Sequence, residues 1–337
     1  MVKLGNVLIV GGGIAGMALA VALDRVGISA EIVEITPQWT ALGTGISLQG
    51  PALRALRAID LLDQCVRVGF GYSEFYACDS EGRIRGTVAL PRLNGPDYPA
   101  TVGVMRPALH AVLQVALAAT RVAVRTSTTV ASLQEDDNGV LVAFDDGSRG
   151  RYGLVVGADG ANSRVRELAF GNDCGPQYTG QAVWRATVRR PDEVEARCSY
   201  FGAHAKAGLN PVSRDAMYIY IVESQAEFVR LEDECLPAIL RERLAEFGGF
   251  VAAAREDIRR PEQITYRPIL SHVMPPPWHR GGIVLIGDAA HTTTPHMASG
   301  AGIALEDSIV LAEILAAAPD LPHALDAFVA RRYTRCR

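Results

Sequence analysis

The glycines near the start of the chain have the spacing of a dinucleotide-binding turn. The apolar segment 7–10 runs directly into Gly11, Gly13 and Gly16, which follow the pattern G-x-G-x-x-G and enclose Ala15. The first glycine permits a tight bend, the second lets the backbone approach a pyrophosphate, and the third lets helix and strand pack closely. Amide groups at the start of the following helix can then bind phosphate. The pattern therefore predicts a dinucleotide site between a strand and a helix.

An acidic residue lies at the position where this motif binds a ribose. Glu34 ends a second predicted strand, 30–34, close to the spacing of about 20 residues expected after the glycines. A carboxylate there accepts a hydrogen bond from a ribose 2′-hydroxyl and repels a 2′-phosphate. The ligand of this turn is therefore expected to be NAD or FAD rather than NADP.

Two further apolar segments each end in a glycine and an aspartate. Segment 154–160 ends in Asp159-Gly160, and segment 282–288 ends in Gly287-Asp288. Such continuous aliphatic runs are typical of buried parallel strands. The two ends of the chain are therefore predicted to form one sheet-and-helix domain, with the region between them inserted as a second, antiparallel sheet.

The three motifs, in this order, resemble those of the FAD-dependent aromatic-ring hydroxylases of the para-hydroxybenzoate hydroxylase type, also called group A flavin monooxygenases. The resemblance extends over nearly the whole chain. It implies an α/β (α+β) fold, with a Rossmann-like FAD-binding domain of the glutathione-reductase type and an inserted antiparallel-sheet substrate domain. The expected FAD-binding domain is 1–177 and 281–337, with small β insertions, and the expected substrate domain is 178–280.

The resemblance also implies which residues surround FAD. Asp288 would bind the ribityl chain, and the amide groups at the start of a helix near 298–302 would face the N1–C2=O edge of the flavin. Arg106 begins a helix, where the helix dipole disfavours a cation without an anionic partner. Asp159 is expected to organise its own loop. The expected cofactor-binding residues are Gly11, Gly13, Ala15, Gly16, Glu34, Ile35, Ser47, Arg106, Val130, Asp159, Asp288, Pro295, Gly300, Ala301 and Gly302.

Candidate substrate residues lie in the inserted region and after Pro295. In the segment 217–221, Tyr218 and Tyr220 fall on one face of a strand and the aliphatic residues on the other. Arg185 is expected on the same sheet, where it suits a carboxylate. His296 is the candidate for contact with the reacting ring and for base catalysis. His291 is expected to hold the loop that carries Gly287-Asp288.

The resemblance implies a flavin-dependent monooxygenase. NADH or NADPH would reduce the flavin, O₂ would add to give a C4a-hydroperoxide, and one oxygen atom would pass to a small electron-rich aromatic or heteroaromatic ring. The sequence has no second G-x-G-x-x-G, which suits a nicotinamide cofactor that docks transiently and equally suits an enzyme that does not use one. No metal is expected in this chemistry.

Composition sets wider limits. The chain has 337 residues, a formal net charge of −4 and 49% hydrophobic residues. It lacks the basic patch expected of a nucleic-acid-binding protein. Its six cysteines are scattered and form no C-x-x-C, which favours reduced thiols and a cytoplasmic protein. No membrane-spanning or targeting segment is predicted. A monomer or a homodimer is expected.

Local patterns predict the remaining elements. The helix after Gly16 is apolar on all sides, as buried helices are, and should end near Gly27. Proline and glycine signals place the other boundaries. The expected elements are helices from Pro51, from Arg106, over 237–247, over 301–317 and from Pro322; a hairpin over 72–90 that turns at 79–82; and strands at 121–125, 128–134, 140–144, 182–188 and 216–222.

Alternatives within and outside this class remain open at this point. The sequence lacks the W-x-W-x-I-P of flavin halogenases. An FAD-dependent epoxidase or reductase of the same superfamily, or a non-catalytic FAD-binding sensor, would carry the same three motifs. A simple NAD-dependent dehydrogenase would not need the second and third. One departure from the family is the loop 35–42, which has Trp39 but no arginine, although many members carry one there.

Overall fold

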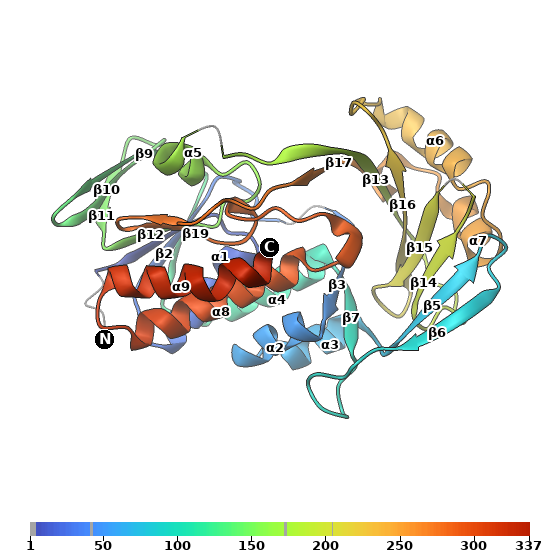
Figure 1. The fold of residues 1–337 in the computed structure, drawn as a ribbon, viewed down its shortest axis with the longest axis horizontal. Helices are drawn as coiled ribbons and strands as arrows, with labels where there is room; N and C mark the ends of the chain where they lie inside the picture. The colour runs from blue at the N-terminus through green and yellow to red at the C-terminus, as the bar shows by residue number, and fades with distance from the viewer. Residues whose placement is uncertain (1–4, 41–42, 172–173, 204) are drawn as a thin grey trace.

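The chain folds into two parts with separate cores in the computed structural model, which describes residues 5–40, 43–171, 174–203 and 205–337 (Figure 1). The larger part holds a mostly parallel sheet covered by helices. The smaller part is a broad sheet with two helices on its outer side. Figure 1 shows the long strands β13 and β17 running from one part into the other. This mixture of helices and sheets is the predicted α/β class.

The sheet of the larger part has six strands in the order β18–β19–β12–β1–β2–β8. All neighbouring strands are parallel except β18 and β19 at one edge. Strands from both ends of the chain belong to it, with β12 between β19 and β1. Its strands are β1 (Val7–Val10), β2 (Ala30–Glu34), β8 (Ala123–Thr126), β12 (Leu154–Gly157), β18 (His279–Arg280) and β19 (Ile283–Leu285).

Helix α1 (Ile14–Arg25) is buried along most of its length, which confirms the prediction from its apolar sequence. It packs against α8 (Gly300–Ala317), and α9 (Leu321–Cys336) lies along α8. Helix α4 (Arg106–Ala118) packs on the other side of α1, with Leu109, Leu113 and Leu117 buried. The first and last helices of the domain therefore share one core.

Smaller elements complete this part. One three-stranded sheet contains β9 (Val130–Asp136), β10 (Gly139–Phe144) and β11 (Arg149–Tyr152), and another contains β3 (Gly45–Gln49), β7 (Thr101–Met105) and β4 (Phe70–Tyr72). The short helices are α2 (Gly50–Ala58), α3 (Leu62–Val68) and α5 (Arg164–Phe170).

The smaller part is a seven-stranded sheet in the order β17–β13–β16–β15–β14–β5–β6. The predicted strands 182–188 and 216–222 lie within β13 and β16, and the predicted hairpin is β5–β6. This hairpin comes from outside 178–280, and β5 pairs with β14 in parallel, so the sheet is not purely antiparallel. Its strands are β5 (Glu74–Asp79), β6 (Ile84–Ala89), β13 (Gln177–Arg189), β14 (Arg197–Phe201), β15 (Lys206–Pro211), β16 (Ala216–Ser224) and β17 (Ile264–Ser271).

Two helices, α6 (Leu236–Arg243) and α7 (Gly249–Asp257), cover the outer face of this sheet. The sequence predicted a single helix over 237–247. That helix is α6, which ends four residues earlier than predicted, and α7 was not predicted. Among the helices in the described ranges, none is both long and apolar enough to cross a membrane.

Candidate functional site

The glycine-rich turn between β1 and α1 has little room for side chains on its inner side. Gly11 adopts a φ of +107°, and a Cβ there would lie 2.5 Å from the carbonyl oxygen of Ala158. A Cβ on Gly16 would overlap the carbonyl oxygen of Gly11. A Cβ on Gly13, by contrast, would meet no atom within 4 Å. The turn is therefore closely packed behind and open in front, where the first amide groups of α1 have no side-chain cap.

Glu34 and Trp39 lie beside this turn. The Glu34 carboxylate accepts hydrogen bonds from the backbone N–H of Gly12 (2.7 Å) and of Thr36 (2.9 Å). The Trp39 indole donates to the Gly12 carbonyl oxygen at 2.7 Å, and its ring lies where a side chain on Gly12 would point. The tryptophan of the arginine-free loop thus covers part of the turn.

In front of the turn is an open cleft with about 1120 Å³ of empty space, here called the main cleft. It gathers eight of the predicted cofactor residues from distant parts of the chain: Gly13, Ala15, Ser47, Arg106, Asp288, Pro295, Gly300 and Ala301. Residues that the predicted list omitted also line it, among them Gly45, Gly160, Arg185, Tyr218, Thr293, Thr294 and Ala298. Thr293 and Thr294 lie inside the motif that ends at Pro295, so the motif itself was a signal for them.

The other predicted cofactor residues do not line the main cleft. Gly11 and Gly16 lie behind the turn, and Gly302 packs against Ala52 of α2. Val130 is buried at the start of β9, whereas Ile35 is 63% exposed. Glu34 and Asp159 contact the turn and a neighbouring loop.

Asp159 organises its loop, as expected. Its carboxylate accepts hydrogen bonds from the hydroxyl of Ser163 (2.5 Å) and the backbone N–H of Val165 (3.0 Å). Ser163 in turn accepts from the N–H of Arg166 and caps α5. Burial raises the pKa of Asp159, and these hydrogen bonds act in the opposite direction.

Arg106 and Asp288 are oppositely charged groups of the main cleft. Burial raises the pKa of the Asp288 carboxyl, and the positive charges of His291 and Arg106 counter that rise. Burial also lowers the pKa of Arg106, with Arg185 acting in the same direction and Asp288 in the other. The main cleft therefore offers two cations, Arg106 and Arg185, and the carboxylate of Asp288 to a ligand that carries phosphates and hydroxyls.

The segment between Asp288 and α8 forms the rim shared by the main cleft and the smaller part. After Pro295 the chain makes one short turn, and Ala298 then adopts a left-handed conformation (φ 50°, ψ 34°). An alanine rarely adopts this conformation, because its Cβ crowds the backbone. Helix α8 begins directly afterwards at Gly300, and its first amide groups have no side-chain cap.

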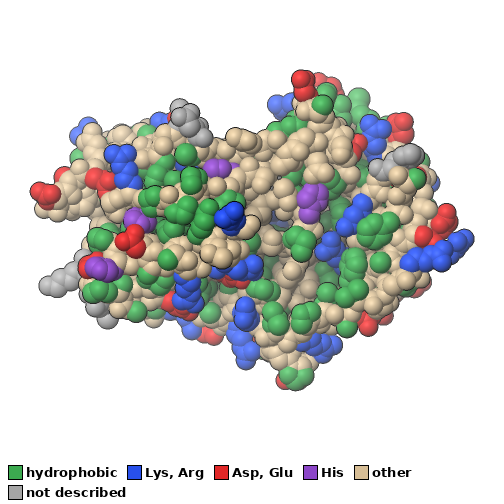
Figure 2. All heavy atoms as spheres, in the orientation of Figure 1, with side chains coloured by type: hydrophobic (Ala, Val, Ile, Leu, Met, Phe, Trp, Pro, Cys, Tyr) green, Lys and Arg blue, Asp and Glu red, His purple; other side chains and the backbone are tan. Residues whose placement is uncertain are grey.

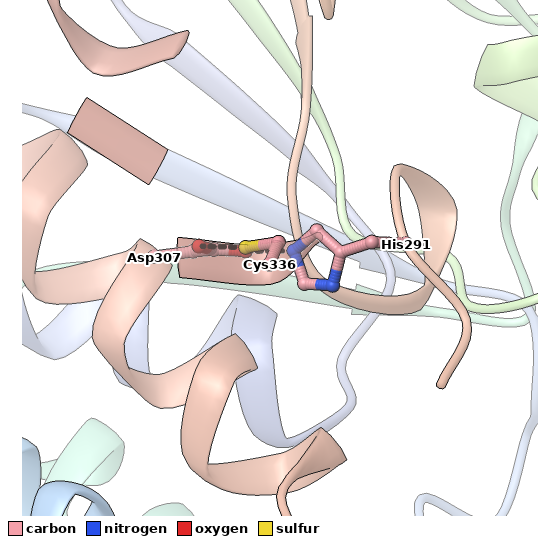
Figure 3. Close-up of side chains that lie close together, drawn as sticks. All are labelled: His291, Asp307 and Cys336. Atoms are coloured by element: carbon pink, nitrogen blue, oxygen red, sulfur yellow. Dashed lines mark hydrogen bonds and ion pairs between the residues drawn. The ribbon is translucent and has the colours of Figure 1, made fainter. Parts of the chain in front are cut away.

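His291 belongs to a buried ionic cluster rather than to the cleft (Figure 3). Its Nε2 lies 2.6 Å from Oδ2 of Asp307, which also accepts the backbone N–H of Gly287 at 2.9 Å. Arg332 of α9 donates to the other oxygen of Asp307 at 2.6 Å. The expectation that His291 holds the Gly287-Asp288 loop is thus confirmed, with Asp307 as the link.

The protonation of this cluster follows from its charges. Burial alone would lower the pKa of His291, but the charge and hydrogen bond of Asp307 outweigh it and raise that pKa to about 10. Burial would raise the pKa of Asp307, yet His291 and Arg332 hold it below its usual range. Although His291, Asp307 and Cys336 lie close enough together to suit a metal ion, two cationic side chains already neutralise the carboxylate.

A second cavity, here called the sheet pocket, opens on the inner face of the seven-stranded sheet and has about 750 Å³ of empty space. Figure 2 shows this side of the molecule hollowed where the two parts meet, with basic and histidine side chains beside the hollow. The predicted substrate residues Arg185, Tyr218, Tyr220 and His296 all line it. So do Gln181, Val183, Arg197, Lys206, Asn210, Val222, Pro295 and Ala298.

Strand alternation places these side chains. Met217, Ile219 and Ile221 pack into the core under α6 and α7, so Tyr218 and Tyr220 face the pocket, as predicted. Cross-strand pairing brings Arg185 opposite Tyr220, and Tyr218 opposite Asn210. Arg197, Lys206 and Asn210 were missed because their strands, β14 and β15, were not predicted.

His296 and Tyr218 each contact a residue of the other part of the molecule. The Nε2 atom of His296, an exposed residue, lies 2.9 Å from Oε1 of Gln181 on β13. The Tyr218 hydroxyl lies 3.5 Å from the Ser47 hydroxyl of β3, and the guanidinium of Arg185 lies over the Tyr218 ring. Arg185, Tyr218, Pro295 and Ala298 line both cavities, which therefore adjoin.

A dinucleotide cleft that opens into a second, smaller pocket is the arrangement of a cofactor-dependent redox enzyme. Residues 5–335 match the family described as "FAD binding domain". The chain belongs to this family, binds FAD and is an FAD-dependent monooxygenase.

Two relatives agree with this assignment, and one solved structure shares the fold. The chain is 31% identical over 318 residues to the 2-heptyl-3-hydroxy-4(1H)-quinolone synthase of Pseudomonas aeruginosa, covering 93% of this chain and 81% of that protein. It is 30% identical over 318 residues to the 6-hydroxynicotinate 3-monooxygenase of Bordetella bronchiseptica, covering 92% and 82%. Its fold resembles Klebsiella pneumoniae HpxO complexed with FAD and uric acid, with a TM-score of 0.88, 23% identity, and 98% and 85% of the chains covered.

Proposed function

We propose that this protein hydroxylates a small electron-rich aromatic or heteroaromatic compound, bound in the sheet pocket, with NADH or NADPH as a transient reductant and O₂ as the oxygen source. The observation that carries the proposal is the junction of the two cavities at Arg185, Tyr218, Pro295 and Ala298. A ring in the sheet pocket would meet a cofactor in the main cleft at these residues.

The residues of the main cleft fit FAD. The open front of Gly13 and the uncapped start of α1 suit a pyrophosphate, and Glu34 lies at the turn where a ribose would bind. Asp288 would accept hydrogen bonds from the ribityl chain, and Arg106 would face its phosphate end. The uncapped start of α8 would stabilise negative charge on the flavin ring. When bound and reduced, FAD would supply the activation of O₂, and the oxygen atom that passes to the ring would come from O₂.

The remaining predicted cofactor residues lie outside the lining of the main cleft and would support it from there. Gly11, Gly16 and Gly302 allow close packing behind the cleft, and Asp159 fixes the loop that presents Gly160. Val130 and Ile35 would lie toward the adenine end. The division into an FAD-binding domain (1–177 and 281–337) and a substrate domain (178–280) is likewise proposed, with the β5–β6 hairpin added to the substrate side.

His296 is proposed to contact the substrate and to take the proton of its ring hydroxyl. Its imidazole lines the sheet pocket next to Pro295, and its Nε2 is paired with the neutral amide of Gln181 rather than with a carboxylate. A base needs only hydrogen-bond reach of the proton that it removes. Tyr218, Tyr220 and Arg185 would orient the ring, and the aliphatic side chains of Val183 and Val222 would keep water away from it.

The test is a substrate screen on the FAD-loaded protein. Hydroxybenzoates, hydroxypyridines and purines are added singly, and the oxidation of NADH and of NADPH is followed together with hydroxylated product and hydrogen peroxide. At least one ring compound should accelerate oxidation and be hydroxylated. An FAD-bound protein that no ring compound accelerates would instead be a sensor or a scaffold.

His296→Gln tests the proposed base once a substrate is known. The variant should lower kcat and increase the fraction of NAD(P)H lost as peroxide, because the ring hydroxyl would lose its proton acceptor. His323→Gln, at an exposed position on α9, is the matched control. Unchanged turnover and coupling in His296→Gln would remove this role.

The localisation and the oligomeric state of the protein are proposed together with the function. All six cysteines are free, which suits the reducing cytoplasm. The protein is proposed to act as a monomer or a homodimer, to be tested by light scattering of the FAD-loaded form.

A further inference from the structure

The rim segment between Pro295 and Gly300 contains a residue in an unfavourable backbone conformation. In the described parts of the chain, three residues other than glycine have a positive φ: Asp60 (58°), Ser127 (55°) and Ala298 (50°). Asp60 and Ser127 are exposed and line neither the main cleft nor the sheet pocket. Ala298 lines both cavities, and its side chain has no polar atom that could compensate the conformation with a local hydrogen bond. Of the three, only Ala298 is therefore strained at the candidate site.

Contacts from both parts of the molecule hold this conformation. Nε2 of Gln49, at the end of β3, donates to the carbonyl oxygen of Met297 at 2.7 Å. On the other side, Nε2 of His296 lies 2.9 Å from Oε1 of Gln181 on β13. A strained residue persists only where its surroundings determine its conformation, and such residues gather at functional sites. Because a glycine adopts the same φ without steric cost, the fold does not require the methyl group of Ala298.

Ala298 differs in the size of its side chain from the other residues at the junction of the two cavities. These are Arg185, Tyr218 and Pro295. Arg185 and Tyr218 have long side chains with rotatable bonds, so their positions depend on the rotamer as well as on the backbone. The single side-chain carbon of Ala298 has no such freedom, and the backbone alone fixes its position. A change of one or a few atoms at residue 298 should therefore change the width of the junction directly.

We propose that Ala298 is a specificity-determining residue, whose side chain sets the size of the ring that reaches the cofactor from the sheet pocket. The strained conformation of Ala298 keeps a methyl group at a position where a glycine would leave the junction wider. The inference rests on the proposed function, because that function places a ring at the junction, but its test measures binding alone.

Two variants of Ala298 separate the width of the junction from the backbone strain. Glycine and asparagine both tolerate the left-handed conformation, so Ala298→Gly and Ala298→Asn should each have a Tm equal to or above that of the wild type. Ala298→Gly removes one carbon from the junction, and Ala298→Asn adds three non-hydrogen atoms. Ser127→Gly is the matched control, because it relieves the same kind of strain at an exposed position outside both cavities.

The experiment measures ring binding to the FAD-loaded protein by calorimetry, without reductant and with free FAD in excess. Three matched pairs of a single ring and a fused ring serve as probes: phenol and 2-naphthol, 4-hydroxypyridine and 4-hydroxyquinoline, and 2-hydroxypyridine and 2-hydroxyquinoline. For at least one pair, Ala298→Gly should shift the preference toward the fused ring by about fourfold or more, which is the effect of one buried methyl group. Ala298→Asn should shift it toward the single ring, and Ser127→Gly should leave it unchanged.

The outcomes separate this inference from the proposed function. Opposite shifts in Ala298→Gly and Ala298→Asn support the inference, even where no ring compound is hydroxylated and the proposed function fails. Shifts in the same direction would show that strain rather than width matters, and they would overturn the inference. It is equally overturned if no probe binds to any of the proteins, if the preference does not change, or if Ala298→Asn no longer takes up FAD. In each of these cases, hydroxylation by the wild type in the substrate screen can still support the proposed function.

Discussion

The main cleft and the sheet pocket adjoin, yet different kinds of residue line them. Nearly half of the residues that line the main cleft are glycine or alanine, and most of them lie in turns or at the starts of helices. The sheet pocket is lined mainly by long side chains on strands, and Ala298 is the one small residue among its described lining. The first offers backbone amides to a ligand, and the second offers side-chain charge and hydroxyls. Binding in the cleft should therefore fail when a side chain is added, and binding in the pocket when one is trimmed.

The largest effect is expected from the ionic cluster that supports only the main cleft. Asp307→Asn would leave His291 buried with an uncompensated charge, would leave Arg332 paired only with Glu306, and would weaken the bond to Gly287. We expect a loss of about 3–5 kcal/mol in the free energy of unfolding, together with weaker retention of FAD. Urea unfolding and the flavin content after gel filtration measure both. Asp320→Asn, at an exposed helix cap, is the control, and equal losses in the two variants would contradict the prediction.

The next largest effect is expected at Gly13, where a substitution should lower FAD affinity without impairing folding. A Cβ on Gly13 would meet no protein atom within 4 Å, so Gly13→Val should fold normally. It would fill the space where the pyrophosphate binds, and FAD affinity should fall about 100-fold or more. Circular dichroism and FAD titration provide the measurement. Gly86→Val is matched, because Gly86 also has open space around its Cβ but lies in the β5–β6 hairpin. A Gly13→Val protein that retains FAD would show that the turn does not contact the cofactor.

The pH dependence of stability tests the buried ionic cluster of His291 and Asp307. His291 has a folded pKa of about 10 against an ordinary value of 6.5, so its protonated form stabilises the fold. This contribution is complete below pH 6.5 and is lost as the pH rises through 10. The free energy of unfolding should therefore fall by about 2–4 kcal/mol between these values, and His291→Gln should flatten the slope. Urea titrations at several pH values measure it, and parallel slopes in the two proteins would contradict it.

The smallest effect concerns the sheet pocket. Tyr220→Phe removes a hydroxyl that contacts Arg197 and Ser199 but leaves the ring in place over Gly208. The dissociation constant of a ring compound that binds in the sheet pocket should rise by about tenfold or less, with FAD content unchanged. Tyr178→Phe is the control, since the Tyr178 hydroxyl donates to the Gln225 carbonyl oxygen outside the pocket. A loss of FAD in Tyr220→Phe would break the distinction between the two cavities.

The two cavities also differ in how far the sequence predicted them. Eight of the cofactor residues expected from the motifs do line the main cleft, because a glycine turn or a helix start is a property of a few consecutive residues. Tyr218 and Tyr220 were assigned to the correct face, since alternation along a strand is equally local. Arg197, Lys206 and Asn210 were missed because no strand was predicted between 189 and 215, although β14 pairs with β15 and β15 with β16 in chain order.

Long-range pairing explains the other differences between the sequence prediction and the structure. The β5–β6 hairpin was predicted, but its addition to the edge of the seven-stranded sheet depends on the parallel pairing of β5 with β14. No sequence signal indicated the role of Asp307. Its partners Gly287 and His291 follow β19, and Arg332 lies on α9, and only the packing of α8 brings these segments together.

By itself, the sequence determined the dinucleotide turn, the FAD-dependent monooxygenase class and the face of the strand that carries the tyrosines. The turn and the face of the strand follow from local backbone geometry and from side-chain periodicity, which neighbouring residues fix. The class follows from the resemblance of the three motifs to a known family. Only the tertiary structure decided which cations share the sheet pocket, that Nε of Arg197 and Nδ2 of Asn210 have no partner among the described residues, and that Asp307 holds the loop of Asp288. Strand register and helix packing bring those residues together, and both depend on contacts between segments far apart in the chain.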